Sequence, residues 1–348
     1  MKNTFLILII SFFLLIISCQ KEKITLGTNV SETFYFENNN TSMRVLVEGN
    51  TASHAFLLIV HGGPGSSSYF YNTDYISENI ENKYAVVYWD QRNAGASQGN
   101  SNGGNLNLDQ MTDDLKKLIL VLKSRYGQNS SIFILGHSFG GLLASSFITT
   151  DNNQAMIKGW IIADGSQNYP LNDSLTRQML LSFGQQQLAE NKYTDEWNSI
   201  ISYCNAHTGN FTFEESNQLI AYAADAETYI DGVKKIDLLT FLKTYAIKYD
   251  WPLTSMYFNY QFSLNARINY DLYKTEFSSS LYKVTTPTLL LFGQYDFICP
   301  QSLGTDILNR INTTDKKMVI SPISGHYTMF QDEEFFCKVV DDFIELHK

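Results

Sequence analysis

Ile132-Phe133-Ile134-Leu135-Gly136-His137-Ser138-Phe139-Gly140-Gly141 is the stretch of this sequence that decides the fold. It runs from a short apolar strand through Gly-x-Ser-x-Gly into small and apolar residues that can open a helix. This order places Ser138 on a sharp turn that has no room for side chains at Gly136 and Gly140, so its hydroxyl is exposed above the sheet. The N-terminus of the following helix favours negative charge at the same place. An ordinary strand-to-helix turn is the alternative, because glycine and serine are common in loops.

Apolar strands and amphipathic helices alternate on both sides of this stretch. Residues 55–60 and 84–89 are almost continuously apolar, as expected of parallel strands that are buried on both faces. Residues 109–126 carry apolar side chains at helical spacing, and so do residues 333–347. Strands that alternate with helices predict an α/β protein in which helices flank a mostly parallel central sheet.

The alternating pattern divides the chain into a core and an insertion. Residues 33–36 and 43–48 look like the strands of a hairpin at the start of the core. We expect the core to comprise residues 41–165 and 284–348. Between its two parts, strand-like runs disappear and aromatic-rich helical stretches replace them, so residues 166–283 are expected to form a helical cap.

The first 18 residues have the composition of a secretory signal peptide, with one basic residue and an apolar run from Phe5 to Ile17. A membrane-spanning anchor is the alternative, but the run is shorter than the roughly 20 residues that cross a bilayer. Ile16-Ile17-Ser18-Cys19 resembles a bacterial lipobox. The resemblance implies cleavage before a lipid-modified Cys19, and a mature protein of the cell envelope, outside the cytoplasm and anchored to a bacterial membrane. Polar residues 19–40 then predict a flexible tether.

Composition and charge exclude several classes of partner. The chain is 44% apolar and 14% aromatic, as in ordinary globular proteins, and its net charge of −10 argues against nucleic acid and against an anionic lipid surface. After Cys19, the cysteines are too sparse for a disulfide framework or a metal site, and allow one bridge at most; they are Cys204, Cys299 and Cys337. We expect no cofactor and no metal.

Three residues that can cooperate in hydrolysis follow strand-like segments, in the chain order Ser138, Asp296, His326. A serine hydroxyl becomes a nucleophile when a base lies within hydrogen-bond reach, and the base needs an acid to fix its tautomer. His326 lies in a Gly-His turn after the last strand-like segment, a position that favours it as the base. Asp164 also follows a strand and is the alternative acid, but the later strand-end loop favours Asp296.

A glycine-rich loop, His61-Gly62-Gly63-Pro64-Gly65, follows the apolar strand at residues 55–60. Adjacent glycines let the backbone turn sharply and present bare N–H groups. We expect the N–H groups of Gly63 and Phe139 to form an oxyanion hole for the negative charge that develops during serine attack. A plain Gly-Pro turn is the alternative.

Over nearly all of its mature length, the chain resembles the α/β-hydrolase superfamily, including the order of nucleophile, acid and base. Within it, His61–Gly65, Asp90-Gln91-Arg92 and Gly136–Gly141 are together similar to the motifs of the prolyl aminopeptidase (prolyl iminopeptidase) group of serine peptidases. The resemblance implies an α/β-hydrolase fold and a peptidase activity. The group's nucleophile, acid, base and oxyanion glycine correspond to Ser138, Asp296, His326 and Gly63.

The chain also departs from that group. Asn93 stands where the group usually has glycine, and the serine turn reads Gly-His-Ser-Phe-Gly where its peptidases often have Gly-Gly-Ser-Trp-Gly. These departures concern peptide specificity rather than hydrolysis. The charges of Asp90 and Arg92 are expected to be structural partners within their loop rather than reacting groups.

We expect a serine hydrolase that acts as an aminopeptidase and releases an N-terminal residue, with proline as a candidate, from short peptides. An esterase or other small-molecule hydrolase on the same triad is the first alternative, and a surface binding lipoprotein on a hydrolase scaffold is the second. The cap carboxylates with which the resembling group binds a free amine have no motif that aligns. Their candidates, by position in the cap alone, are Glu214, Glu215 and Glu227; for each of them, a solvated helix charge is the alternative.

Overall fold

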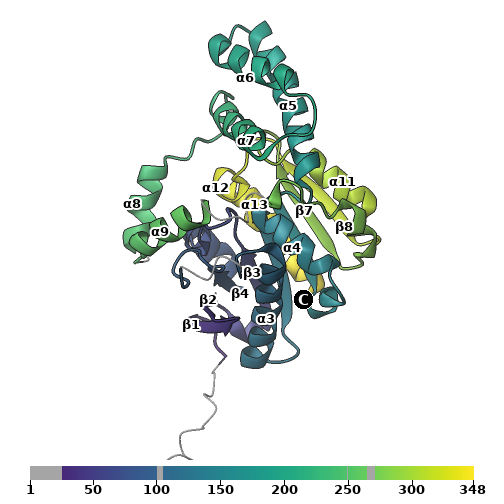
Figure 1. Ribbon diagram of the computed structural model, residues 1–348. Coiled ribbons are helices and arrows are strands. Elements are labelled where there is room, and N and C mark those ends of the chain that lie inside the picture. Colours follow the sequence, from purple (N-terminus) through teal and green to yellow (C-terminus); the bar gives the residue numbers. More distant parts are fainter. Residues whose placement is uncertain (1–25, 100–104, 249, 265–270) are drawn as a thin grey trace, which may run out of the picture.

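The computed structural model describes residues 26–99, 105–248, 250–264 and 271–348. These residues form an eight-stranded sheet with the strand order β1-β2-β4-β3-β5-β6-β7-β8 (Figure 1). β2 pairs antiparallel with β1 and β4, and all other neighbours are parallel. The predicted α/β class with a mostly parallel sheet is therefore confirmed. The strands are β1 (Val30–Asn38), β2 (Thr41–Gly49), β3 (Ala55–Val60), β4 (Ala85–Trp89), β5 (Ser131–Ser138), β6 (Gly159–Gly165), β7 (Thr288–Gly293) and β8 (Lys316–Ser321).

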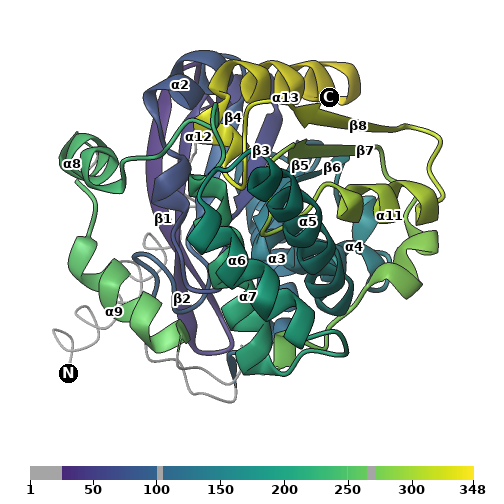
Figure 2. The same cartoon turned by 90° about the horizontal axis from the view of Figure 1, so that it is seen from above.

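Helices cover both faces of the sheet (Figure 2). Successive side chains of a strand point to opposite faces, so β3 contributes Phe56, Leu58 and Val60 to one apolar core and Leu57 and Ile59 to the other. The first core includes side chains of α3 (Leu108–Tyr126), α4 (Phe139–Thr149) and α11 (Ser302–Arg310). The second includes those of α2 (Asp74–Ile76), α12 (Thr328–Gln331) and α13 (Glu333–His347).

The N-terminal hairpin corrects one predicted boundary. Its strands pair as expected, with Phe34 opposite Val45 and Phe36 opposite Met43. However, β1 begins at Val30, inside the segment 19–40 that the sequence predicts as a tether. β1 is an edge strand whose residues are mostly exposed or half-buried, and edge strands are often polar, so its composition resembles that of a linker. The predicted signal peptide and Cys19 lie outside the described residues.

Between β6 and β7, the described residues form helices and no strand of the sheet, in the region predicted as a cap. In Figure 1, α5, α6 and α7 stand above the sheet. They share a buried apolar cluster around Trp197, and this cluster also contains Phe297, which follows β7. The cap thus packs directly on a loop at the carboxyl edge of the sheet. Its helices are α5 (Tyr169–Ala189), α6 (Thr194–Ala206), α7 (Phe213–Thr228), α8 (Leu238–Lys248) and α9 (Leu253–Leu264).

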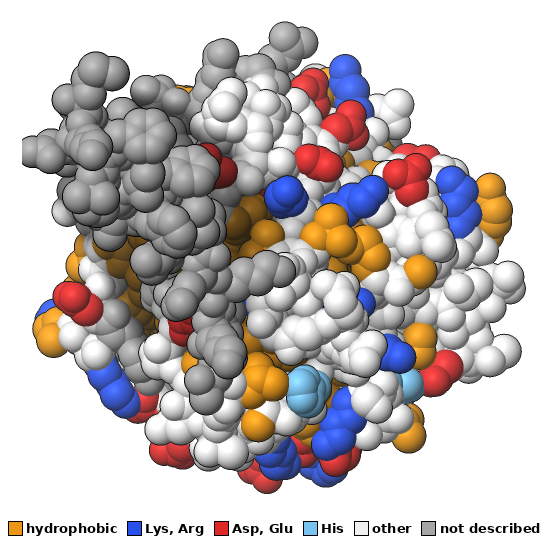
Figure 3. Space-filling model, turned by 90° about the horizontal axis from the view of Figure 1, so that it is seen from below, with side chains coloured by type: hydrophobic (Ala, Val, Ile, Leu, Met, Phe, Trp, Pro, Cys, Tyr) orange, Lys and Arg blue, Asp and Glu red, His pale blue; other side chains and the backbone are white. Residues whose placement is uncertain are grey.

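The surface away from the cap mixes both signs of charge. Figure 3 shows acidic and basic side chains interspersed on the face seen from below. Among the described helices, none combines the length and apolar character needed to cross a membrane.

Candidate active site

The turn that follows β5 has the geometry predicted from its glycines. Ser138 ends β5 directly before α4 and has a φ of 55°, in the left-handed region that side chains rarely adopt. A Cβ on Gly136 would lie 2.5 Å from the Gly140 carbonyl oxygen, and a Cβ on Gly140 would lie 1.9 Å from that of Val60. Both positions therefore require glycine, and the tight packing holds Ser138 in its strained conformation.

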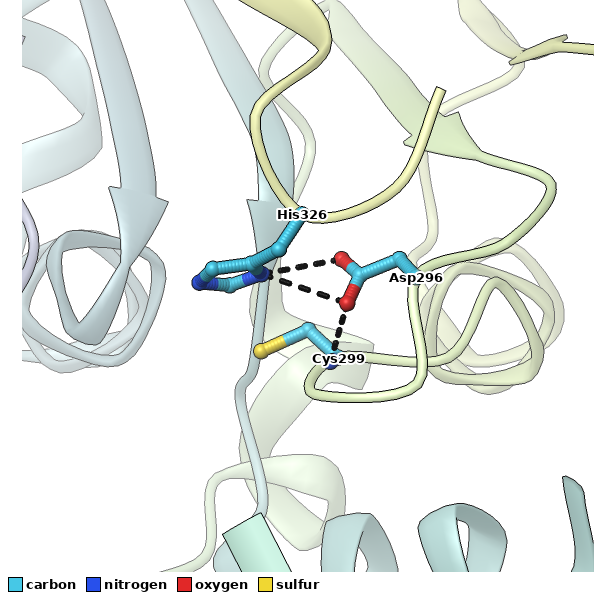
Figure 4. Close-up of side chains that lie close together, drawn as sticks. All are labelled: Asp296, Cys299 and His326. Atoms are coloured by element: carbon cyan, nitrogen blue, oxygen red, sulfur yellow. Dashed lines mark hydrogen bonds and ion pairs between the residues drawn. The ribbon is translucent and has the colours of Figure 1, made fainter. Parts of the chain in front are cut away.

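Ser138, His326 and Asp296 lie together at the carboxyl edge of the sheet, on the loops after β5, β8 and β7. His326 Nε2 is 3.0 Å from Ser138 Oγ. On the other side of the ring, His326 Nδ1 is 3.0 and 3.2 Å from the two oxygens of Asp296 (Figure 4). An ionised carboxylate only accepts hydrogen bonds, so Nδ1 carries the proton and Nε2 can accept one from the serine hydroxyl. His326 is 3% exposed and Asp296 is fully buried.

The alternative acid, Asp164, has different partners. Its carboxylate accepts hydrogen bonds from the backbone N–H of Gly293 at 2.8 Å and of Thr328 at 2.9 Å, and from the Thr328 hydroxyl at 3.2 Å. Gly293 precedes Asp296 and Thr328 follows His326, so Asp164 ties together the two loops that carry these residues. The geometry favours Asp296 as the partner of His326.

The electrostatic environment suits a histidine that acts as a base. Burial lowers the pKa of His326 below its usual value, while the nearby charges of Glu227 and Asp164 act in the opposite direction. A lowered pKa keeps the ring neutral, and its Nε2 available, at neutral pH. Burial also raises the pKa of Asp296, against the effect of the N–H groups of Cys299 and Ile298, which donate to its carboxylate.

The glycine-rich loop after β3 packs against the serine. A Cβ on Gly62 would lie 2.9 Å from Ser138 Cβ, so only a residue without a side chain can approach this closely. The next residue, Gly63, has a φ of 120°, and Phe139 is the first residue of α4. This loop and the first residue of α4 thus both adjoin Ser138, and the N–H groups of Gly63 and Phe139 stay the predicted oxyanion donors.

The Asp90–Arg92 motif is structural, but its partners differ from those predicted. Asp90 accepts hydrogen bonds from the Ser67 and Ser68 hydroxyls and from backbone N–H groups, including that of Ala96. Arg92 is paired with Asp114 of α3, outside the loop, at 2.5 and 2.7 Å. This partner was missed because it becomes a neighbour only when α3 packs on the sheet.

Asn93, which follows this motif, has a φ of 54°. Asparagine tolerates this left-handed conformation better than most residues with side chains. A left-handed conformation that usually favours glycine is thus occupied here by asparagine, a residue that tolerates it.

The structure separates the three cap glutamates. Glu214 is exposed, and Glu215 caps the start of α7 by accepting a hydrogen bond from the N–H of Thr212. Glu227, in the last turn of α7, is buried and accepts a hydrogen bond from the backbone N–H of His326 at 3.1 Å. Burial, followed by the charge of Asp296, raises the pKa of Glu227 to about 8. Only Glu227 of the three is brought to the site.

Cys299 also lies beside the site. Its N–H donates to Asp296 at 2.7 Å, and one ligand atom from each of Asp296, Cys299 and His326 lies within 4.8 Å of the others (Figure 4). Thiolate, imidazole and carboxylate are zinc ligands. Here, however, His326 and Asp296 are bonded to each other, and burial raises the pKa of the Cys299 thiol, which keeps it protonated. Cys204, Cys299 and Cys337 are all free.

Comparisons with known proteins agree with this fold. The family model of the alpha/beta hydrolase fold matches residues 56–333. The chain is 23% identical over 309 residues to a proline iminopeptidase of Saccharolobus solfataricus (strain ATCC 35092 / DSM 1617 / JCM 11322 / P2), an alignment that covers 84% of this chain and 86% of that protein.

Two solved structures show how widely the fold is shared. A proline iminopeptidase of Mycobacterium smegmatis aligns with a TM-score of 0.66 and 16% identity, over 91% of this chain and 98% of that one. An esterase of Exiguobacterium antarcticum aligns with a TM-score of 0.55 and 16% identity, over 90% and 100%. At these identities, the two structures support the fold alone.

The chain therefore belongs to the α/β-hydrolase fold family. Within that family, the predicted resemblance to the prolyl iminopeptidases is confirmed by the relative aligned over most of both chains.

Proposed function

We propose that this chain is a serine hydrolase of the aminopeptidase type, which releases an N-terminal residue, proline among them, from short peptides. The observation that carries the proposal is the continuous path from Ser138 Oγ to His326 Nε2 at 3.0 Å, and from His326 Nδ1 to Asp296 at 3.0 Å. A buried, neutral imidazole oriented by a carboxylate is the arrangement that activates a serine hydroxyl.

In the proposed reaction, Ser138 Oγ attacks the scissile carbonyl carbon while His326 Nε2 takes its proton. The N–H groups of Gly63 and Phe139 stabilise the oxyanion that forms. His326 then donates its proton to the leaving amine, and the C–N bond breaks to give an acyl-enzyme. Water, activated by the same nitrogen, hydrolyses the ester and restores Ser138. Asp296 stabilises the imidazolium throughout.

Glu227 supports the aminopeptidase form of the proposal. In a substrate cleaved after its first residue, one carbon separates the amine nitrogen from the scissile carbonyl, so the group that binds the amine must lie close to Ser138. One oxygen of Glu227 accepts the N–H of His326, and among the described residues no hydrogen bond to its other oxygen, Oε2, is found. We propose that Oε2 receives the substrate's ammonium group, and that Glu214 and Glu215 do not bind it.

An esterase is the second candidate. Its support is the elbow Gly-His-Ser-Phe-Gly, which departs from that of the resembling peptidases. The fold is compatible with this activity, because an esterase shares it. The test compares kcat/KM for a proline arylamide with its amine free, the same arylamide acetylated, and p-nitrophenyl acetate. Preference for the free amine supports the aminopeptidase. Faster cleavage of the ester than of either arylamide moves the assignment to the esterase. If none of the three substrates is cleaved, the surface binding lipoprotein is the function that remains.

Glu227→Gln should lower kcat/KM for the free-amine arylamide by about 10- to 100-fold, because an ion pair with a buried carboxylate is stronger than one in water. With a pKa of about 8, Glu227 is largely protonated at neutral pH in the free enzyme, and the positive charge of a bound ammonium group favours its ionised form. The amide can still accept the N–H of His326 through its oxygen, so cleavage of p-nitrophenyl acetate should change by less than about threefold. Glu214→Gln, on the exposed face of the same helix, is the matched control. An equal loss on both substrates would show that Glu227 supports the site without binding the amine.

We further propose that Cys19 carries lipid and anchors the protein to a bacterial membrane. The supporting observation is the sequence Ile16-Ile17-Ser18-Cys19 after an apolar run. Cys19→Ser should therefore yield an uncleaved precursor without lipid. Metabolic labelling with a palmitate analogue checks this, with Cys204→Ser as the control, and equal label on the wild type and Cys19→Ser would refute it.

A further inference from the structure

Every polar group of His326 has a partner. Its ring nitrogens face Ser138 and Asp296, and its backbone N–H donates to Glu227. The fourth group, the backbone carbonyl oxygen, lies 2.9 Å from Nε2 of His137. His137 directly precedes the serine in the chain, so the histidine that serves as base is tied at its backbone to the turn that carries the nucleophile.

The protonation state of His137 follows from its partners. A carbonyl oxygen can only accept, so His137 Nε2 carries the proton. Burial lowers the pKa of His137 to about 3, which keeps the ring neutral and leaves a lone pair on Nδ1. Nδ1 lies 2.6 Å from the hydroxyl of Tyr71, so Tyr71 donates to it. Burial raises the pKa of Tyr71, and the hydroxyl keeps its proton.

Tyr71 extends this connection to the glycine-rich loop. It ends the short helix η2 (Ser68–Tyr71), and its hydroxyl oxygen accepts the N–H of Gly62 at 3.4 Å. The hydrogen bonds thus run from Gly62 through Tyr71 and His137 to His326. The side chains of Tyr71 and His137 are 4% and 3% exposed, and their rings pack edge to face. Neither residue exchanges a proton in the proposed reaction.

We propose that Tyr71 and His137 are positioning residues. They hold two loops in place around Ser138: the loop that carries His326 and the glycine-rich loop that contains Gly62. The inference rests on the proposed serine hydrolase and adds two residues to its machinery. His137 is central because its two nitrogens bond to different segments: Nε2 donates to the carbonyl of His326, and Nδ1 accepts from Tyr71 at the end of η2. His137 also packs against the His326 ring, with centroids 5.0 Å apart.

Loss of the bond between His137 and the His326 carbonyl should slow the reaction rather than weaken substrate binding. Without the bond to its carbonyl, the backbone of His326 can shift, and its Nε2 moves relative to Ser138 Oγ. A displacement of about 1 Å costs about 10²-fold in rate when the reacting groups must be aligned. Groups that bind the substrate are untouched, so kcat should fall while KM stays nearly constant.

Three variants separate the bond between His137 and the His326 carbonyl from the bond between His137 and Tyr71. Tyr71→Phe removes only the hydroxyl and should lower kcat about tenfold. His137→Leu removes both bonds of the ring and should lower kcat about 100-fold. His137→Gln places an amide nitrogen near the position of Nε2, so it can still donate to the His326 carbonyl and should keep kcat within about tenfold of wild type. Tyr75→Phe, at a half-buried tyrosine of α2, is the matched control.

The measurements are kcat and KM for p-nitrophenyl acetate and the proline arylamide, the rate at which a fluorophosphonate labels Ser138, and thermal unfolding. We expect labelling to fall in the same order as kcat, with Tyr75→Phe unchanged. Wild-type kcat and labelling in Tyr71→Phe and His137→Leu, with a lowered melting temperature, would overturn the proposal and leave a purely structural role. If His137→Leu does not fold, Tyr71→Phe decides alone.

If the chain is not a serine hydrolase, the labelling experiment gives a different result. In that case the fluorophosphonate would label wild type and Ser138→Ala alike, whatever Tyr71 and His137 do. Labelling that depends on Ser138 but not on Tyr71 or His137 would keep the serine hydrolase and reject only the positioning residues.

Discussion

Ser138→Ala should abolish turnover and leave the fold intact. Loss of the nucleophile of a serine triad costs on the order of 10⁴- to 10⁶-fold in kcat. The strained φ of 55° at this position is held by the close packing of Gly136 and Gly140 rather than by the hydroxyl, so alanine fits the same turn. The change removes one oxygen atom whose partner is His326 Nε2.

The experiment measures kcat/KM for both the arylamide and the ester, together with the thermal unfolding of each variant. Ser124→Ala, at an exposed position of α3, is the matched control and should equal wild type in both. Turnover by Ser138→Ala within tenfold of wild type, with unfolding unchanged, would remove Ser138 from the mechanism. The same result on the ester alone would show that ester cleavage occurs elsewhere on the protein.

The features that the sequence predicts well are those encoded locally. The apolar run, glycines and small residues around Ser138 specify a strand, a tight turn and a helix without reference to distant residues. Asp296 and His326 could be selected because they follow strand-like segments, and carboxyl ends of parallel strands meet at one edge of the sheet. Residues 30–32 were not predicted as part of β1, because an edge strand needs few apolar residues.

The features that the sequence does not predict depend on contacts between distant segments. Glu227 lies 99 residues before His326, and nothing in its own helix distinguishes it from Glu214 or Glu215. Tyr71 and His137 were not assigned a role, since their bond spans 66 residues, and that of His137 to the His326 carbonyl spans 189. His137 carried one signal, its place inside the Gly-x-Ser-x-Gly turn, but the direction of its ring depends on how the loops pack.

Asp296→Asn should reduce kcat by about 10⁴-fold, because it reverses the tautomer of His326. Oδ1 of Asp296 accepts the N–H of Ile298 at 2.9 Å and of Cys299 at 2.7 Å. An asparagine keeps these two bonds only if its carbonyl oxygen takes that position. Its NH₂ group then takes the position of Oδ2, which in the wild type lies 3.0 Å from His326 Nδ1. The carbonyl oxygen in the place of Oδ1 lies farther from Nδ1, at 3.2 Å, and already accepts two N–H groups. The NH₂ group therefore donates to Nδ1, so the ring places its proton on Nε2 and can no longer accept one from Ser138.

Asp164→Asn tests the assignment of the acid, because Asp164 is as buried as Asp296 but its hydrogen bonds go to Gly293 and Thr328 rather than to the ring. All its hydrogen bonds are accepted, from Gly293 and Thr328, so an amide must point a donor at a donor and should destabilise the fold by about 1–3 kcal/mol. In the molecules that remain folded, kcat should fall far less than in Asp296→Asn. Measuring kcat per active site, titrated with the fluorophosphonate, together with the free energy of unfolding separates the two effects. A larger loss of kcat in Asp164→Asn than in Asp296→Asn would make Asp164 the acid of the triad, since only the carboxylate that sets the tautomer of His326 can have the greater kinetic effect.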